Sequence, residues 1–330
     1  MSDKKVFYSI DLLKFLMCIL IVQIHTSGFS YPLELNYSTN VMVGQAVPTF
    51  FIISSFLFFR GYFLLSASDR RSKGIDKLLH FIKRLLILYL FWFIVWLPWI
   101  IKEKELLHHN MWEDLGILIH GFFFSYTFHG SWFISGLLIA VIFIWLFDRY
   151  RLYLLIPSVY LFCYGFLNGW YLPELYRFLQ DTFRPELSLT FIYALIWVPF
   201  GYFLSIPYVE DVYKKWKVSL LVLLYIVLYL VETITGNRHI CIFSIPLLFV
   251  IFHNWDISKR GIFILLRKVS IIIYIFHFIV VGVFKHIVSS HDRLNGPLYM
   301  MIVFVISFVV AYAIVRLSER KYFGWLKWAY

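Results

Sequence analysis

The chain has 330 residues, of which 61% are apolar or aromatic and only 15% are charged. Soluble domains reach roughly 45–50% apolar content even when glycine is included, so this composition excludes a soluble globular fold and predicts a membrane protein with several spans. The net charge of +11 must therefore be judged against membrane topology before it is read as a sign of nucleic-acid binding. The three cysteines each lie in an apolar run and provide no disulfide framework: Cys18, Cys163 and Cys241.

Apolar runs long enough to cross a hydrocarbon core of ~30 Å follow one another along the chain. Their continuous hydrophobicity predicts helices, because barrel strands would alternate apolar and polar residues. A further apolar stretch at 115–128 is too short to cross and return, and we interpret it as a re-entrant or interfacial segment. We therefore predict an all-α polytopic helical bundle, a single transmembrane domain over residues 1–330, with about ten spans: 7–29, 44–65, 79–101, 131–147, 152–168, 188–206, 218–235, 240–253, 269–288 and 297–316.

Basic residues are distributed unevenly between the two sets of connecting loops. With the N-terminus in the cytoplasm, ten crossings return the C-terminus to the same side, and 22 of the 30 Lys and Arg residues then lie inside, against seven outside. The positive-inside rule therefore predicts cytoplasmic termini and explains most of the excess charge without nucleic acid. Residues 316–330 mix basic and aromatic side chains and are expected to lie along the inner interface as an amphipathic tail.

The first predicted span contains three ionisable residues, Asp11, Lys14 and His25. Such residues inside a membrane usually mark a functional site or a pair inside the bundle. Lys14 and His25 are eleven residues apart, so they share one helix face and lie about 16 Å apart along its axis. Asp11 precedes Lys14 by one turn and can pair with it. Taken alone, this helix also allows a simpler interpretation, in which Lys14 extends to the inner interface and His25 is a hydrogen-bonded packing residue.

Two further spans contribute candidate residues. In the second, Pro48 is expected to kink the helix or open its first turn, and Ser54 follows in the same helix. In the ninth, Tyr274 precedes His277, which is expected near the membrane midplane. Two intramembrane histidines on different helices are difficult to explain by packing alone.

Charged residues near the ends of other spans complete the candidates. Lys83 and Arg84 are expected to open the third helix, where they could hold a phosphate group. Glu232, near the outer end of the seventh span, is a candidate for orienting an imidazole or binding a sugar hydroxyl, or else a simple interfacial carboxylate. An outer loop has loosely metal-like spacing but lies among lysines, and we predict no metal site there: Glu105, His108 and His109.

The order and spacing of these residues resemble the membrane-bound acyltransferase-3 family, whose members are O-acyltransferases of bacterial surface glycans. The family signature of a basic residue, ten residues and a histidine corresponds to Lys14 and His25, preceded by Asp11. The second-span motif Val-Pro-x-Phe-Phe-x-x-Ser-Gly matches from Val47 to Ser54, with Ser55 in place of glycine. Three further motifs match, the first with Leu88 where a proline is usual: Lys83-Arg84 with Tyr89, Trp132-Phe133, and Tyr274 with His277.

This resemblance implies a mechanism with acyl-CoA as a co-substrate and no bound cofactor. The phosphates of acyl-CoA would be held from the cytoplasmic side by a basic set with a nearby hydroxyl: Lys14, Lys83, Arg84 and Ser54. His25 would act as a general base or briefly accept the acyl group, since an imidazole changes protonation near neutral pH. Asp11 would support the catalytic set, and Tyr274 and His277 would orient His25 or polarise the thioester carbonyl. The acceptor would contact His129, Trp132 and Glu232.

Two other classes of function stay open at this stage. A transporter or flippase for a lipid-linked glycan could use the two histidines as a proton relay, although no repeat of halves is visible. A structural membrane protein would leave the ionisable residues unexplained. For an acyltransferase we expect the bacterial inner membrane, contact with membrane lipid and polysaccharide biosynthesis machinery, an acetyl or succinyl donor, and a glycan, lipid-linked sugar or small exported molecule as acceptor.

Overall fold

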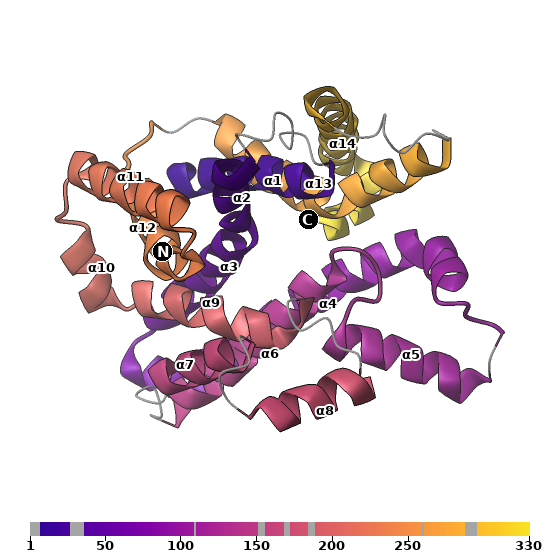
Figure 1. Ribbon diagram of the computed structural model, residues 1–330, viewed down its shortest axis with the longest axis horizontal. Helices are drawn as coiled ribbons and strands as arrows, with labels where there is room; N and C mark the ends of the chain where they lie inside the picture. Colours follow the sequence, from indigo (N-terminus) through magenta and orange to yellow (C-terminus); the bar gives the residue numbers. More distant parts are fainter. Residues whose placement is uncertain are drawn as a thin grey trace. The chain divides into compact units, whose positions relative to one another are not determined.

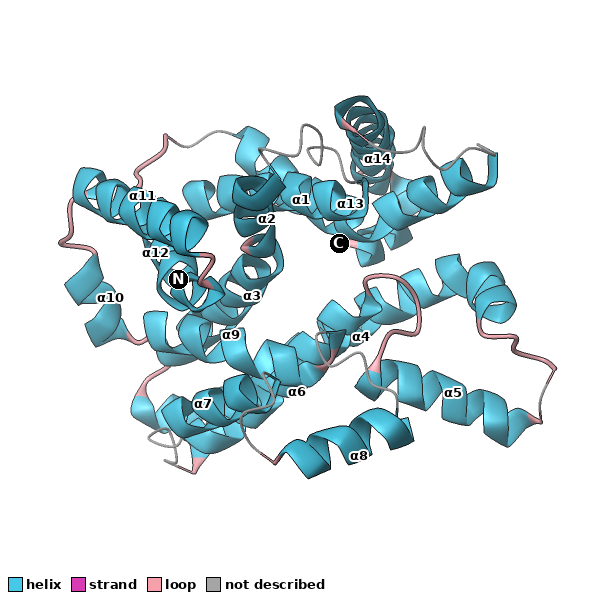
Figure 2. Ribbon diagram, in the orientation of Figure 1, coloured by secondary structure: helices cyan, strands magenta, loops and turns pink. Residues whose placement is uncertain are grey.

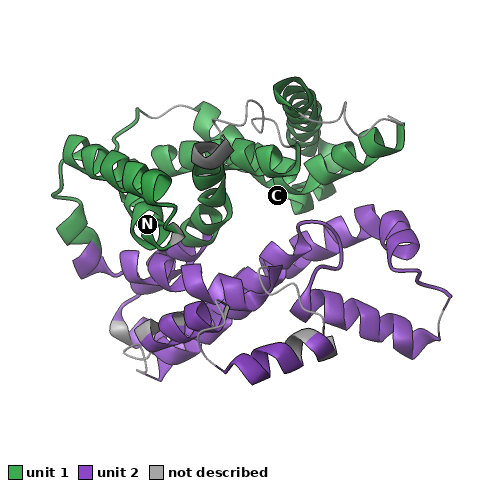
Figure 3. Ribbon diagram, viewed as in Figure 1, with its two compact units in different colours: residues 1–53, 210–330 green, residues 54–209 purple. Residues whose placement is uncertain are grey.

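The computed structural model describes residues 7–26, 36–108, 110–150, 156–167, 172–183, 189–258, 261–287 and 296–330. Within these ranges the chain forms helices and short connecting segments, without strands (Figures 1 and 2). It divides into two compact units, residues 1–53 with 210–330 and residues 54–209 (Figure 3). A few predicted positions lie outside the described residues, namely His109 and the span ends at 27–29, 152–155, 168, 188 and 288.

The all-α polytopic architecture is confirmed. Among the described residues, seven helices are long and apolar enough to cross a membrane, or eight if the bent pair α9 (Phe191–Leu204) and α10 (Pro207–Tyr213) forms one span. Two other expected spans correspond to shorter helices, α7 (Ile156–Leu167) and α12 (Cys241–Asn254), so a count of ten crossings stays a prediction. The seven longer spans lie in α1 (Tyr8–Thr26), α2 (Asn36–Gly44) with α3 (Ala46–Phe63), α4 (Ala67–Glu103), α6 (Ser131–Arg149), α11 (Val218–Thr235), α13 (Gly261–Ile287) and α14 (Pro297–Ser318). The second span begins at Asn40 and the third at Ser72, so the first turn of α4 precedes the span.

In the first unit, helices α1 and α13 pack side by side along their length and run in the same direction. Asp11 lies 3.8 Å from Arg267, the Cys18 thiol contacts the Ser270 carbonyl at 3.4 Å, and His25 lies against His277. The contacts therefore ascend both helices together. Helix α14 packs against both, and the aromatic ring of Phe15 meets Phe304 and Phe308 edge-on.

Pro48 lies in the first turn of α3, as the sequence predicted. Proline has no backbone N–H and cannot continue the hydrogen-bond ladder of a preceding helix. The chain breaks at Gln45, between α2 and α3, and the Thr49 hydroxyl donates a 2.7 Å hydrogen bond to the Gln45 carbonyl. This break places the buried Gln45 side chain inside the first unit.

In the second unit, α4 begins earlier than expected. Its first residue is Ala67, because the Ser66 hydroxyl caps the helix by accepting from the Asp69 backbone N–H at 3.1 Å. Lys83 and Arg84 therefore lie in the middle of a 37-residue helix, and the expectation that they open it was wrong.

The apolar stretch expected to be re-entrant forms α5 (Met111–Phe124), capped by Asn110 and packed against α6. Whether it re-enters the membrane stays a prediction. A short amphipathic helix, α8 (Pro173–Phe183), also belongs to this unit. The C-terminal tail forms a 3₁₀ segment, Lys321–Ala329, which packs on α14 in the first unit, with Ser318 and Tyr330 joined by a 2.8 Å hydrogen bond.

Candidate functional site

The two intramembrane histidines meet in the first unit. The rings of His25 on α1 and His277 on α13 have centroids 5.3 Å apart and are tilted by 38°. The His25 side chain is exposed, whereas His277 is fully buried. Phe278 packs against both rings, at 4.3 Å and 4.1 Å. The accessible imidazole of His25 thus packs against the buried imidazole of His277.

A hydrogen bond fixes the orientation of the His277 ring. Its Nδ1 lies 2.9 Å from the Ile273 carbonyl oxygen, one turn earlier in α13. A carbonyl oxygen can only accept, so Nδ1 carries the proton, and in the neutral form of the imidazole Nε2 is then the accepting nitrogen. Such a ring can accept a hydrogen bond or a proton.

Cationic groups lie toward the other end of the same two helices. The buried carboxylate of Asp11 is paired with Arg267 of α13. The Lys14 ammonium lies 5.6 Å from the centre of the Phe50 ring, and Phe50 packs in turn against the buried Tyr274 ring at 5.8 Å. Helix geometry separates Lys14 from His25 by about 16 Å along α1. In the first unit, Lys14 and Arg267 therefore lie toward one end of the α1–α13 pair, and the two imidazoles lie toward the other.

Glu232 is buried on α11, in the same unit. It shares a helix face with Tyr225 and Tyr229, whose rings stack with centroids 6.4 Å apart. The Tyr225 hydroxyl donates a 2.6 Å hydrogen bond to the Gln45 side-chain oxygen, and the Gln45 amide donates to Ser244 at 3.4 Å. This network ties α11 and α12 to the break before α3.

The second unit carries a separate polar and aromatic cluster, where α4 ends and α6 begins. His129 stacks on Tyr126 with ring centroids 5.0 Å apart and meets the edge of Trp96 at 5.7 Å. Its Nε2 lies 3.7 Å from the Glu103 carboxylate, and the Tyr126 hydroxyl donates to the same carboxylate at 3.4 Å. Lys104 lies over the Tyr126 ring at 4.5 Å. We call Trp96, Glu103, Tyr126 and His129 the α4-end cluster.

The remaining predicted residues are also in the second unit. Trp132 is 9% exposed and packs edge-on against Tyr193 of α9. Lys83 and Arg84 are exposed on α4, and Ser54 is half-buried in α3. The structure thus brings together Asp11, Lys14, His25, Tyr274 and His277 within one unit, and it surrounds His129 with aromatic rings in the other.

A family model described as an acyltransferase domain matches residues 7–316. The chain belongs to the acyltransferase-3 family. The matched region extends over both compact units and includes every candidate residue, so the resemblance found in the sequence motifs is confirmed. A search of curated proteins found no significant match, and a search of solved structures found none either. Membership of this family, together with several helices long and apolar enough to cross a membrane, identifies the protein as a membrane acyltransferase in the general sense.

Several residues that contribute to these clusters in the acyltransferase were not singled out in the sequence. Arg267 had been counted only as a topogenic charge, and Glu103, Trp96 and Gln45 carried no motif. Their roles depend on partners distant in the chain, which a single sequence does not reveal. Within the described residues, no group of three or more His, Cys, Asp or Glu side chains is arranged to hold a metal ion.

Proposed function

We propose that the protein is a membrane O-acyltransferase that moves an acyl group, in the simplest case acetyl, from cytoplasmic acyl-CoA to a hydroxyl of a surface glycan or a lipid-linked sugar. The observation that carries this proposal is the pairing of an exposed His25 with a buried His277 at 5.3 Å, on a helix pair with Lys14 and Arg267 toward its other end. A proton acceptor and a phosphate-binding end on one helix pair are what transfer from acyl-CoA requires.

In the proposed reaction, His25 takes the proton of the acceptor hydroxyl as its oxygen attacks the thioester carbonyl carbon. The carbon–sulfur bond breaks, CoA leaves as the thiolate, and the proton passes from His25 to the sulfur. His277 is a positioning residue, because its anchored ring supports His25 and can share the added charge.

The donor would enter from the cytoplasmic side, and its phosphates would contact Lys14 of the first unit. The family resemblance also proposes Lys83 and Arg84 of the second unit as phosphate-binding residues. The pantetheine arm is long enough for the distance of about 16 Å from Lys14 to His25. This proposal includes the orientation with both termini inside, a bacterial inner membrane, and work alongside polysaccharide biosynthesis enzymes. The positive-inside distribution of Lys and Arg supports the orientation.

The test is transfer of labelled acetyl from acetyl-CoA to the glycan fraction of vesicles containing the protein. Wild type and Ile24→Ala, a change at an exposed neighbour on α1, should transfer label at similar rates. His25→Ala should lose about 100-fold or more, the usual contribution of a general base. If His25→Ala inserts normally and transfers as well as wild type, the assignment is wrong. Glycolipid movement driven by a proton gradient, without acetyl-CoA consumption, would instead establish the transporter.

A further inference from the structure

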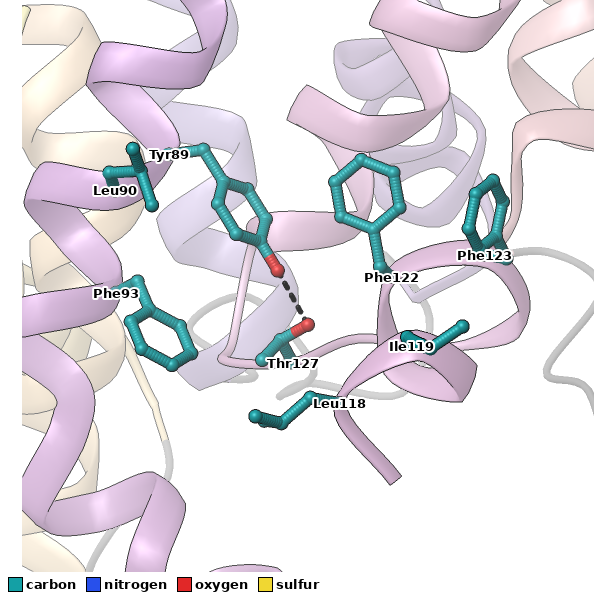
Figure 4. A pocket seen from close by; sticks show the side chains of 8 residues that line it. All are labelled: Tyr89, Leu90, Phe93, Leu118, Ile119, Phe122, Phe123 and Thr127. Carbon is teal, nitrogen blue, oxygen red and sulfur yellow. Dashed lines mark hydrogen bonds between the residues drawn. The ribbon is translucent and has the colours of Figure 1, made fainter. Parts of the chain in front are cut away.

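An apolar groove lies between α4 and α5 in the second unit, as Figure 4 shows. Its volume is about 290 Å³, near the lower end of the range roughly 300–1,000 Å³ that is typical of ligand pockets. Phe93 lines it from α4, and Leu118 and Phe122 line it from α5. The two hydroxyls in its wall, on Tyr89 and Thr127, are bonded to one another at 2.6 Å. The groove is therefore suited to hydrocarbon.

The rim of the groove is exposed and apolar as well. Leu90 is 55% exposed and Ile119 is 50% exposed, and only 17% of the apolar window of the α4 span is buried inside the protein. In water such an exposed apolar surface would favour aggregation. On a membrane-spanning helix it faces lipid, so the bilayer itself supplies the hydrocarbon chain that fills the groove.

A stripe of side chains on α4 leads from this groove to the α4-end cluster. Tyr89, Phe93, Trp96 and Glu103 follow one another at steps of three, four or seven residues, which places them on one helix face. From Tyr89 to Glu103 the helix rises about 21 Å. The groove and the α4-end cluster therefore lie along one face of α4, at the distance that separates a hydrocarbon chain from the polar head of the same lipid.

The α4-end cluster has the chemistry of a site for a hydroxylated head group. The Glu103 carboxylate accepts hydrogen bonds from hydroxyls, and the stacked Tyr126 and His129 rings offer a flat surface to the C–H face of a sugar. Trp96 is 1% exposed, and its indole N–H finds no acceptor among the described residues. Buried N–H groups are rarely left without a partner, and an oxygen of a bound head group would supply one.

Gly121 fixes the geometry of the groove. A Cβ atom there would lie 3.0 Å from the Tyr126 carbonyl oxygen and 3.2 Å from Thr127 Cα, which is tighter than most real Cβ contacts, so this backbone would have to shift. The glycine lets α5 approach the segment that holds Thr127 against Tyr89. Gly116, also on α5, has nothing within 4 Å of the same position. The two glycines are therefore a matched pair for testing the groove.

We infer that the second unit binds a glycosylated membrane lipid, with its hydrocarbon chain in the α4–α5 groove and its sugar at the α4-end cluster. That this lipid is the acyl acceptor rests on the proposed function, whereas the binding itself does not. Among the acceptors left open by the sequence, this geometry favours the lipid-linked sugar over a soluble glycan.

The test uses the full-length protein in lipid nanodiscs and two photoactivatable probes with the same diazirine-bearing alkyl chain, one with a glucoside head and one with a phosphocholine head. Labelling is mapped by mass spectrometry on the peptides covering residues 85–104 and 111–130. The glucoside probe should label both peptides saturably and more strongly than the phosphocholine probe. Gly121→Ala should lower this labelling about tenfold, whereas Gly116→Ala should not change it. Glu103→Gln should lower glucoside labelling about tenfold through loss of a charged acceptor, without changing phosphocholine labelling.

Equal labelling by both probes would mean that the groove is filled by ordinary bilayer lipid, and this would overturn the inference. Equal effects of Gly121→Ala and Gly116→Ala on labelling would overturn it as well. His25→Ala separates the two proposals, because it should abolish acetyl transfer and leave probe labelling intact. If wild type transfers no acetyl group but still labels with head-group preference, the proposed function fails and the lipid site stands.

Discussion

His25 and His277 lie ring to ring on two parallel helices, and a hydrogen bond to the Ile273 carbonyl holds the His277 ring. The exposed His25 is the proposed general base, and the buried His277 is the proposed positioning residue. His277→Asn keeps an N–H near the Nδ1 position, so the ring's anchor to Ile273 can be replaced while Nε2 is lost. We expect kcat to fall about 100-fold, with little change in KM for acetyl-CoA or in thermal stability.

Steady-state kinetics and a melting curve in the same detergent check this. Unchanged kcat in His277→Asn would reduce His277 to a packing residue. A loss of both activity and stability would point to a structural role alone.

Lys14 is expected to act on the donor's phosphates. Lys14→Met keeps the apolar stem and removes the charge, so KM for acetyl-CoA should rise about tenfold, as expected for the loss of one charged hydrogen bond. Lys285→Met, in the last turn of α13, is the matched control and should leave KM unchanged. The comparison of acetyl-CoA with its 3′-dephospho form gives the decisive measurement, because a phosphate contact predicts a smaller effect on the donor that lacks a phosphate. An equal effect on both donors would argue against contact with that phosphate.

The ion pair between Asp11 and Arg267 joins α1 to α13. Arg267→Ala leaves a buried carboxylate without this partner, and we expect it to destabilise the protein more than the double variant with Asp11→Asn does. The coupling should be about 1–3 kcal/mol in a double-mutant cycle. Denaturation of the four proteins in mixed micelles measures it. Additive effects of the two changes would show that the pair contributes nothing beyond its members.

A second buried pair, Glu210 and His253, lies away from the proposed chemistry. Glu210 is 5% exposed, lies 3.3 Å from His253 Nε2 and binds Lys214 at 2.7 Å. Glu210→Gln should lower stability by about 1–3 kcal/mol, because it removes the charge that these two partners face. Asp211→Asn, with a 74% exposed side chain 3.9 Å from the same lysine, should change stability by less than about 0.5 kcal/mol. Equal melting temperatures for both variants would contradict this.

The start of α4 should respond to acid. Hydrogen bonds from Lys73 and Ser66 hold the pKa of the Asp69 carboxyl below its ordinary value of 3.8. Because the folded pKa is lowered, the stabilisation is complete above the ordinary value and is lost as the pH falls through the folded one. Amides of residues 67–72 should therefore exchange hydrogen faster, relative to the rest of α4, once the pH drops below 3.8. Asp69→Asn should remove this pH dependence, and a persistent acid response in that variant would assign it to another group.

Local signals in the sequence were sufficient for part of this structure. Pro48 was expected to kink a helix or to open its first turn, and it lies in the first turn of α3, because proline acts on its own backbone and the preceding turn. The true start of α4 was also encoded locally, in the cap formed by Ser66 and Asp69. The start expected from the sequence was too late, because the apolar run begins only near residue 79 and Lys83 and Arg84 lie at its beginning. Hydrophobicity identifies only the part of the helix that lies in the membrane. The helix itself begins earlier, in the polar segment that precedes this part.

Other parts needed the folded chain. Asp11 was expected to pair with its neighbour Lys14, and the structure places Arg267 at the same carboxylate. The grouping of Glu103 with His129 likewise joins two helices through a loop. Partners of this kind depend on which helices pack together, and neither spacing nor composition in one sequence carries that information.

The parallel packing of α1 against α13 also sets the order in which the protein can become active. Cys18 and Ser270, which touch in the folded protein, are 252 residues apart. At a synthesis rate of 5–20 residues per second, α1 waits about 10–50 s for its partner to leave the ribosome. During that time the Asp11 carboxylate has no Arg267, and His25 has no second imidazole behind it. Under the proposed mechanism, a nascent chain is therefore expected to transfer no acyl group before α13 is inserted, and a product that ends before α13 is expected to be inactive.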